Sequence, residues 1–202
     1  MISHPLEIDY WNSSARIVGT DEAGRGPIAG PLVVAGVVFD KGYRNEEIDD
    51  SKKLSEKKRE RLFEQIIEDA KAYEILVVCE QTIDALNIYR ATQVAMEQIA
   101  KDLKGDLVLT DAMPLRNYDG SFVAVVKGDQ KSLSIAAASI LAKVTRDHWM
   151  FKLDAMHEEY GFKKHKGYPT KQHIENLSRY GVLDIHRKSY GPVKKQLEIK
   201  LF

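Results

Sequence analysis

The sequence has few features that would place the protein outside a cell or in a membrane. Its single cysteine, Cys79, cannot form an internal disulfide, which favours a reducing compartment. It contains no run of about 18 apolar residues, so we expect no transmembrane helix. Residues 1–11 lack the basic and then apolar pattern of a secretory signal. These absences predict a cytoplasmic protein.

The chain also lacks net charge, since 30 basic residues balance 30 acidic ones. The distribution is uneven, because residues 127–202 carry 15 basic and 8 acidic side chains, whereas residues 1–126 carry 15 and 22. A basic C-terminal part could follow a phosphate backbone, although a solvated surface explains the charges equally well. With 202 residues, of which 44% are hydrophobic, we predict a single globular domain, 1–202.

Apolar runs and capping residues predict an α/β fold. The expected strands are 16–20, 32–39, 73–78, 107–110 and 121–126. The expected helices are one capped by Ser55 and reaching about residue 71, 88–103, 133 to about 160, and one from Thr170 to Gly181. This order predicts a five-stranded mixed sheet flanked by helices, with a helical C-terminal appendage from about residue 161.

Two adjacent acids, Asp21 and Glu22, follow the first strand and precede Gly24-Arg25-Gly26. Unit charges about 4 Å apart repel by roughly 4 kcal/mol at an effective dielectric of 20. A cation offsets that repulsion, so the pair predicts a metal site. The two glycines allow close approach of the backbone to a ligand, and Arg25 has a side chain suited to phosphate.

Two further acids, Asp111 and Asp129, also stand at or just past strand ends, where ligands commonly bind in open α/β sheets. A single strand-end aspartate more often caps a helix, forms a turn or is solvated. Four acids, delivered by three elements, favour a pair of divalent ions that would cleave a phosphodiester.

Ser139, Lys143 and Arg146 are spaced i, i+4 and i+7 in the alanine-rich helix that follows. A hydroxyl and two cations on one helix face suit phosphate contacts. The alternative is a solvated helix face, which is the commoner meaning of such a stripe.

Several longer motifs occur in an order that resembles ribonuclease HII, and the resemblance covers nearly the whole chain. These motifs are Asp21-Glu22-Ala23-Gly24-Arg25-Gly26-Pro27, Asp50-Ser51-Lys52-Lys53-Leu54, Lys127-Gly128-Asp129 through Asp147, His165-Lys166-Gly167-Tyr168-Pro169-Thr170 and His186-Arg187-Lys188-Ser189. The resemblance implies an RNase H-like fold. It also implies an endonuclease that hydrolyses the RNA strand of RNA–DNA hybrids and cuts 5′ of ribonucleotides embedded in duplex DNA. The implied mechanism uses two metal ions and leaves 3′-hydroxyl and 5′-phosphate ends.

The resemblance also implies roles for particular residues. Two Mg²⁺ or Mn²⁺ ions would be held by Asp21, Glu22, Asp111 and Asp129. Substrate would be contacted near the RNA–DNA junction by Gly24, Arg25 and Gly26, with Tyr168 sensing the junction. Substrate phosphates would be approached by Lys52, Lys53, Ser139, Lys143 and Arg146. The chain departs from the family at Ala112, where many members have glycine.

Three rival functions are weighed against this one. Ribonuclease HIII usually carries an N-terminal extension and a different glycine turn, whereas Asp21 lies near the start of this chain and Arg25 fits the HII pattern. A resolvase-like nuclease should not require a 2′-hydroxyl. A non-catalytic nucleic-acid-binding protein has no use for four repelling acids beside a polyanion. The tail, Gln196-Leu197-Glu198-Ile199 with Leu201-Phe202, resembles a clamp-binding peptide, and a packed terminal segment is the alternative.

Overall fold

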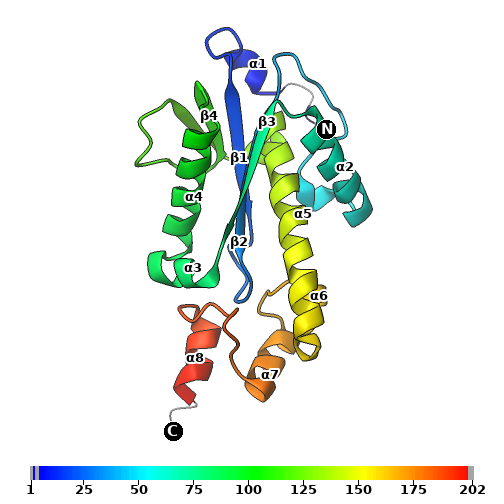
Figure 1. Cartoon of the computed structure of the whole chain (residues 1–202), viewed down its shortest axis with the longest axis vertical. Coiled ribbons are helices and arrows are strands. Elements are labelled where there is room, and N and C mark those ends of the chain that lie inside the picture. Colours follow the sequence, from blue (N-terminus) through cyan, green and yellow to red (C-terminus); the bar gives the residue numbers. More distant parts are fainter. Residues whose placement is uncertain (1, 3–4, 200–202) are drawn as a thin grey trace. The chain divides into compact units, whose positions relative to one another are not determined.

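The computed structural model describes residue 2 and residues 5–199, which form two compact units (Figure 1). For the described residues, the sheet unit is Met1–Ala23, Val33–Leu76 and Thr92–Val144, and the helical unit is Gly24–Leu32, Val77–Ala91 and Thr145–Phe202. The helical unit therefore combines the C-terminal part of the chain with two earlier segments. The organisation as one domain with an appendage from about residue 161 stays a prediction.

Five strands form one mixed sheet in the order β3-β2-β1-β4-β5, which confirms the predicted sheet (Figure 1). The strands are β1 (Ile17–Ala23), β2 (Leu32–Val38), β3 (Ala72–Val78), β4 (Leu107–Asp111) and β5 (Phe122–Val125). β1 runs antiparallel to β2 and parallel to β4, and β4 runs parallel to β5. β2 is buried along its whole length, as its continuous apolar sequence predicts.

β1 is longer than the sequence predicts, because it continues past Thr20 to Ala23 and includes both adjacent acids. The extension is paired with β2, where Asp21 lies opposite Ala35 and Glu22 opposite Val34. Expecting the strand to end before two charges was wrong, since the apolar partner strand supplies the backbone hydrogen bonds that extend it. The acids are therefore held within a strand and not in a loop.

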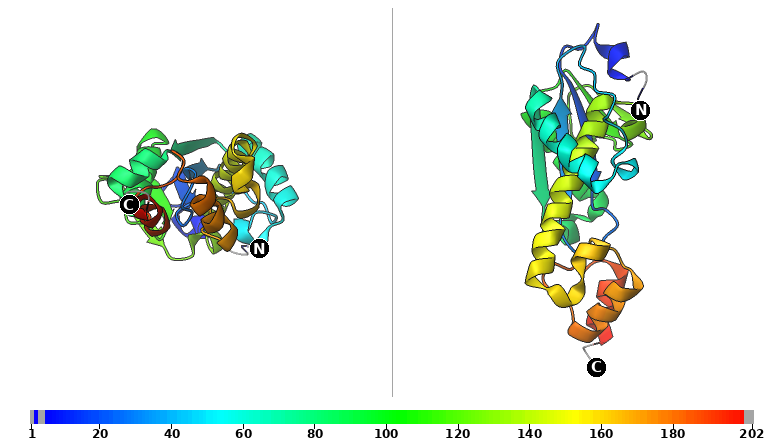
Figure 2. Two further views of the ribbon diagram at one scale, coloured as in Figure 1. Left: turned by 90° about the horizontal axis from the view of Figure 1, so that it is seen from below. Right: turned by 90° about the vertical axis from the view of Figure 1, so that its right-hand side faces the viewer.

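Helices cover both faces of the sheet, so the sheet unit has three layers (Figure 2). On one face, α2 (Glu56–Asp69) and α5 (Leu133–Met156) pack against alternate residues of β2 in a core that contains Val33, Ala35 and Val37. On the other face lies α4 (Ile88–Asp102), where a Cβ on Gly36 would collide with Ile99. The period of two along β2 thus divides its side chains between the two helical layers.

The caps predicted for two helices are present. Ser55 accepts a hydrogen bond from the Lys58 amide at 3.3 Å, and Thr170 accepts one from the His173 amide at 3.2 Å. Shorter helices were not predicted, and α5 ends earlier than expected. The remaining helices are α1 (Glu7–Tyr10), α3 (Glu80–Leu86), α6 (Phe162–His165), α7 (Lys171–Tyr180) and α8 (Gly191–Ile199).

α1 has a specific task, which is to cap α5. The buried Glu7 carboxylate accepts hydrogen bonds from the Ser134 amide at 2.8 Å and the Leu133 amide at 3.2 Å. It also accepts one from the Ser132 hydroxyl at 2.6 Å. A carboxylate at a helix N-terminus satisfies unpaired amides and interacts favourably with the helix dipole. The N-terminal segment therefore fixes where the long helix begins.

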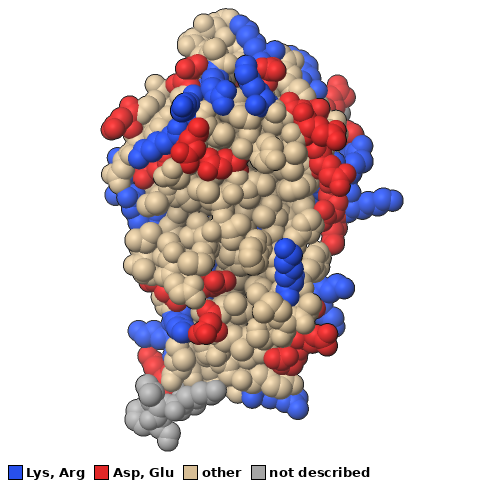
Figure 3. Space-filling model, in the orientation of Figure 1, with Lys and Arg blue, Asp and Glu red and all other residues tan. Residues whose placement is uncertain are grey.

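Charge on the surface is mixed where it can be followed in Figure 3. Both basic and acidic side chains are visible at the right-hand edge of that view, where α2 lies, in keeping with its sequence EKKRERLFEQIIED. That edge therefore presents no field of one sign. Among the described residues, none of the helices has the length and apolarity needed to cross a membrane.

The helical unit contains a relay of neutral, buried histidines. His173 donates from Nδ1 to the Tyr168 carbonyl at 2.9 Å, and its Nε2 lies 3.2 Å from Nε2 of His186. His186 Nδ1 accepts from the Leu183 amide at 3.0 Å, so His186 must carry its proton on Nε2 and donate to His173. Each nitrogen thus has a partner only while both rings are neutral. Burial lowers the pKa of both His173 and His186 to about 4.

We predict that this relay makes the protein less stable in mild acid. In an unfolded chain, each histidine would bind a proton near pH 6.5. The unfolded state therefore holds more protons between pH 6.5 and about 4, so the histidines lower the free energy of unfolding as pH falls through that range. Between pH 7 and pH 5, the His186→Gln variant should lose less stability than the wild type, by on the order of 2 kcal/mol.

The measurement is urea unfolding followed by circular dichroism at both pH values. The buried carboxyls of Asp21 and Asp129 have raised pKa values and act in the opposite direction, so the comparison with the variant isolates the histidines. His148→Gln, at an exposed position of α5, is the matched control. Equal losses in the wild type and the His186→Gln variant would contradict the neutral relay.

Candidate active site

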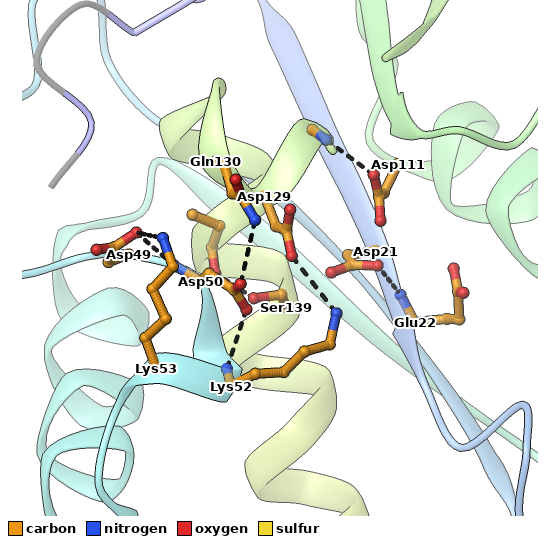
Figure 4. Close-up of polar contacts among 12 residues, drawn as sticks. Asp21, Glu22, Asp49, Asp50, Lys52, Lys53, Asp111, Asp129, Gln130 and Ser139 are labelled. Carbon is orange, nitrogen blue, oxygen red and sulfur yellow. Dashed lines mark hydrogen bonds and ion pairs between the residues drawn. The ribbon is translucent and has the colours of Figure 1, made fainter. Parts of the chain in front are cut away.

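Three carboxylates converge at one edge of the sheet unit (Figure 4). Asp21 comes from β1, Asp111 from the last position of β4, and Asp129 from a short 3-10 turn, Gly128–Gln130. Each offers an oxygen, and these three oxygens lie within 4.8 Å of one another. Three of the four predicted acids are therefore brought together, from positions up to 108 residues apart in the sequence.

Strand pairing and one glycine produce this convergence. β1 and β4 are parallel with Thr20 opposite Thr110, so the next residue of each strand, Asp21 and Asp111, stands at the same level. The Gly128 amide donates to Asp111 Oδ1 at 2.8 Å, which ties the turn to the strand. A Cβ on Gly128 would lie 2.6 Å from Ile135 Cδ1, so a larger residue here would require the Ile135 side chain to move. Asp129 follows directly and is held beside the strand ends.

The backbone bends sharply at the residue after Asp111. Ala112 has a φ of 53°, in the left-handed region that favours glycine. Its amide still donates to the Val125 carbonyl at 3.0 Å, so the bend from β4 remains hydrogen-bonded to β5. Asp111 therefore stays paired with Val125 of β5, at the expense of some backbone strain at Ala112.

The electrostatics of the three acids favour a bound cation. Burial raises the pKa of Asp21 well above its ordinary value, and repulsion from Glu22 and Asp111 raises it further. Burial also raises the pKa of Asp129, together with the nearby charges of Asp50 and Asp111. Carboxylate oxygens are the ligands that hard divalent cations prefer, and such a cation would relieve the repulsion. The donor set fits Mg²⁺ or Mn²⁺.

Glu22, the fourth predicted acid, lies apart from this group. Successive side chains of a strand point to opposite faces, and Figure 4 shows the Glu22 carboxylate directed away from Asp129. Among the residues that the structure describes, the oxygens grouped within 4.8 Å belong to Asp21, Asp111 and Asp129 alone. The Glu22 amide, however, donates to Asp21 Oδ1 at 2.7 Å and so orients that carboxylate. Metal binding by Glu22 itself stays a prediction.

One lysine reaches the acids. Lys52 Nζ lies 3.6 Å from Asp129 Oδ2, and the Lys52 side chain is otherwise 80% exposed. Burial alone would lower the pKa of Lys52, but attraction to Asp129 and Asp50 raises it. Lys53 instead pairs with Asp49 at 3.3 Å and is half exposed. Contact of either lysine with phosphate stays a prediction, and their exposure is compatible with it.

Asp50 lies next to the acids, although the sequence analysis assigned it no role. It is buried, and its Oδ1 accepts from the Lys52 amide at 3.0 Å, which fixes the turn that carries the lysine. Its Oδ2 accepts from Gln130 Nε2 at 3.4 Å, next to Asp129. The spacing Asp-x-Lys is a capping pattern that could have indicated the first contact. The second depends on residues 80 positions apart.

The predicted stripe on α5 is not an exposed face. Ser139 is buried, and its hydroxyl donates to the Ala136 carbonyl at 2.9 Å. Lys143 is half-buried. Arg146 is 1% exposed and donates to the Pro31 carbonyl at 3.0 Å and the Ala29 carbonyl at 3.3 Å. We therefore correct the assignment of Arg146, whose guanidinium supports the backbone inside the helical unit and is not displayed to phosphate.

The glycine turn and Tyr168 meet within the helical unit. Gly24 has a φ of 102°, and a Cβ there would collide with the Arg146 side chain. A Cβ on Gly26 would lie 3.2 Å from Tyr168 Cε1, so the tyrosine ring rests against this glycine. Tyr168 is 48% exposed, and Arg25 is also exposed. The turn thus combines a tightly packed first glycine with an accessible surface formed by Arg25, Gly26 and Tyr168.

Comparisons with known proteins agree with these features. The family model described as Ribonuclease HII matches residues 18–193. A ribonuclease HII from Francisella tularensis subsp. tularensis is 55% identical over 180 residues, which are 88% of this chain and 96% of that protein.

Solved structures show the same fold. The crystal structure of ribonuclease H2 from Pyrococcus horikoshii has a TM-score of 0.77 and 29% identity, covering 91% of this chain and 98% of that one. The structure of a PCNA:RNase HII complex from Archaeoglobus fulgidus has a TM-score of 0.75 and 28% identity, covering 87% and 95%. These likenesses confirm the predicted RNase H-like fold.

We predict that replacing Asp21, Asp111 or Asp129 singly by asparagine weakens Mn²⁺ binding by about tenfold or more, because each change removes a charged oxygen ligand. Isothermal titration with Mn²⁺ measures this effect. Asp119→Asn, at an exposed position between β4 and β5, is the matched control and should bind like the wild type.

The Asp21→Asn variant should also be more stable than the metal-free wild type at pH 7. A carboxyl with a raised pKa destabilises the folded state when it is ionised, and the amide removes that charge. Weaker Mn²⁺ binding together with higher metal-free stability distinguishes loss of a ligand from general damage. Unchanged Mn²⁺ affinity in all three variants would exclude the cluster as a metal site.

Proposed function

The chain belongs to the ribonuclease HII family, and from this membership we propose that it cuts both RNA–DNA hybrids and DNA that contains single ribonucleotides. As a ribonuclease H it is an endonuclease. The finer part of the proposal is cleavage 5′ of a ribonucleotide embedded in duplex DNA, leaving 3′-hydroxyl and 5′-phosphate ends. The observation that carries the proposal is the convergence of Asp21, Asp111 and Asp129 within 4.8 Å.

The proposed cofactor is a pair of divalent cations, Mg²⁺ or Mn²⁺. When bound, such ions activate a water molecule and stabilise the leaving oxygen in phosphodiester hydrolysis. Asp21, Asp111 and Asp129 supply hard ligands from three elements of a rigid sheet edge. Glu22 is proposed as the fourth ligand, on the other side of β1. Because the carboxylates of Asp21, Asp111 and Asp129 are already close together, these three need little reorganisation to receive a cation.

The proposed substrate contacts divide between phosphate and ribose. Lys52 and Lys53 stand on an exposed turn and would approach backbone phosphates, as would the half-buried Lys143 of α5. The buried Ser139 could join them only by giving up its hydrogen bond to the Ala136 carbonyl. The Gly24-Arg25-Gly26 turn would contact the ribose near the RNA–DNA junction, since a 2′-hydroxyl is what distinguishes RNA from DNA at one position. The exposed ring of Tyr168, resting against Gly26, would lie against the neighbouring sugar.

A replication clamp is proposed as a protein partner. The Archaeoglobus structure contains PCNA bound to a ribonuclease HII, and the tail of this chain carries Gln196-Leu197-Glu198-Ile199. Within α8, Leu197 packs with Ile28 and Val193, whereas Leu201 and Phe202 lie outside the described residues. A clamp would recruit the enzyme to DNA, and we place that activity in the cytoplasm. The lone cysteine suits this compartment.

The rival functions explain less of the molecule. The family model that matches is that of ribonuclease HII, which favours it over ribonuclease HIII. A resolvase-like nuclease would use the acids but not the glycine turn and its tyrosine. In a protein that only binds nucleic acid, carboxylates held together at the binding site would weaken binding, because they repel the phosphates of the nucleic acid.

We predict that the protein nicks a DNA duplex carrying one ribonucleotide when Mg²⁺ or Mn²⁺ is present, and that a chelator stops the reaction. Asp129→Asn should lower the rate by about a thousandfold or more, because it removes a ligand from the reacting centre, while hybrid binding largely survives. Gel analysis of end-labelled duplexes measures the nick and its 5′ position. Asp119→Asn should cut like the wild type.

Metal-dependent nicking at wild-type rate by the Asp129→Asn variant would remove Asp129 from the site. Absence of any metal-dependent nick by the wild type would overturn the proposed function as a whole.

We predict that Tyr168→Ala reduces cleavage at a single ribonucleotide about tenfold more than cleavage of a continuous RNA–DNA hybrid. A lone ribonucleotide offers one RNA–DNA junction, so loss of the ring beside that junction should reduce its cleavage strongly. A continuous hybrid offers many positions at which the enzyme can bind and cut, so its cleavage should fall less. The measurement is kcat/KM on both substrates. Tyr180→Phe, at another exposed tyrosine of the helical unit, is the control. Equal losses on both substrates would refute the junction-sensing role.

A further inference from the structure

Arg187 is completely buried. Its guanidinium donates hydrogen bonds to backbone carbonyls in and after the glycine turn. Nη2 donates to the Gly24 carbonyl at 2.7 Å and to the Gly30 carbonyl at 2.8 Å. Nη1 donates to the Arg25 carbonyl at 3.2 Å, and Nε donates to Gly30 at 3.1 Å. Four of its hydrogen bonds therefore end on the segment that contains the Gly24-Arg25-Gly26 turn.

Tyr190 completes this arrangement from the same part of the chain. Its hydroxyl donates to the Arg25 carbonyl at 2.8 Å and accepts from Arg187 Nη1 at 3.1 Å. The guanidinium carbon also lies 5.2 Å from the centroid of the Tyr190 ring. The Arg25 carbonyl thus receives two donors, which is the full capacity of its two lone pairs.

Burying a guanidinium is costly, and packing alone does not require one. The planar guanidinium group of an arginine can donate in fixed directions to several carbonyls at once, whereas the ammonium group of a lysine is a single point charge. Arg146 lies in the same unit and donates to Ala29 and Pro31. Two buried cations near one segment repel each other, and this repulsion adds to burial in lowering the pKa of Arg146 to about 10. The fold therefore maintains an unfavourable charge to hold these carbonyls.

The direction of those carbonyls decides where the amides point. In a trans peptide unit, the carbonyl and the next amide point in opposite directions. Since the carbonyls of Gly24 and Arg25 face Arg187, the amides of Arg25 and Gly26 face away from it. Both residues are exposed, and Tyr168 lies against Gly26. Arg187 thus sets the direction of two backbone amides in the exposed part of the turn.

We propose that Arg187 and Tyr190 are positioning residues that orient the Arg25 and Gly26 amides for recognition of a ribose 2′-hydroxyl. The inference rests on the proposed function and adds residues that support the turn from inside the protein. Neither side chain contacts the substrate in this scheme. Their effect is on the direction of peptide groups, so they should influence discrimination between ribose and deoxyribose more than overall binding.

The test compares Arg187→Lys and Tyr190→Phe with the wild type in duplex binding without divalent metal. The measured quantity is the ratio of the Kd for an all-DNA duplex to the Kd for the same duplex with one ribonucleotide. We expect this ratio to fall about tenfold in Arg187→Lys and about threefold in Tyr190→Phe. Loss of one fixed hydrogen bond should act on the ribose contact, and binding of the all-DNA duplex should stay within about twofold.

The matched controls are Arg179→Lys and Tyr180→Phe. In this pair the Arg179 guanidinium carbon likewise lies 5.2 Å from the Tyr180 centroid, and both residues belong to α7. The controls should keep the wild-type ratio. Thermal unfolding and Mn²⁺ titration of each variant identify damage to the fold or to the acidic cluster. If Arg187→Lys does not fold, Tyr190→Phe decides the question, since it removes a single oxygen.

The outcomes separate this inference from the function on which it rests. If the wild type makes no metal-dependent nick, the proposed function fails and the inference fails with it. If the wild type nicks but folded variants keep its ribose preference, or lose affinity for both duplexes equally, Arg187 and Tyr190 have only a structural role. A wild type that nicks but shows no ribose preference in binding also overturns the inference.

Discussion

The position of β1 between β2 and β4 is the constraint on which the site depends. Antiparallel pairing with β2 extends β1 beyond Thr20, so that Asp21 is held in a strand and largely buried. Parallel pairing with β4 then sets Asp21 and Asp111 at the same level. The two carboxylates do not favour this arrangement themselves, because their charges repel each other. The backbone hydrogen bonds of three strands supply the stability that keeps the repelling groups together.

Close approach of α5 to the sheet completes the arrangement, and small residues make it possible. A Cβ on Gly19 would collide with the backbone at the start of α5, and Gly128 allows the preceding turn to lie beside Asp111. Glu7 fixes the first turn of the helix through its carboxylate. As a result, Asp129 is placed by packing and capping within a few residues of the helix start. The alanine-rich sequence from residue 136 to 138 serves the same close packing.

Each compact unit buries charged groups, and the surroundings of two of these groups differ in a way that indicates different roles. In the sheet unit, Asp21 and Asp129 are buried near other acids, and their raised pKa values express an electrostatic cost that a cation would remove. In the helical unit, Arg187 is buried among carbonyls that already accept its hydrogen bonds. Unrelieved negative charge indicates a place for a ligand, whereas a buried cation whose donors are satisfied by backbone carbonyls and a tyrosine hydroxyl indicates a scaffold.

The sequence alone determined the strands, the main helices, the acids and the glycine turn, because these depend on local periodicity, on capping side chains such as Ser55, and on residue chemistry. The family resemblance supplied the substrate. Only the tertiary structure decided that Glu22 points away from Asp129, that Asp50 lies beside the acids, and that Arg146 is buried. The Asp21 and Glu22 side chains point to opposite faces because β1 continues past them to Ala23. Burial of a side chain depends on segments that are distant in the sequence. A helical spacing of i, i+4 and i+7 defines a face but not what covers it, and in α5 that face is covered by protein.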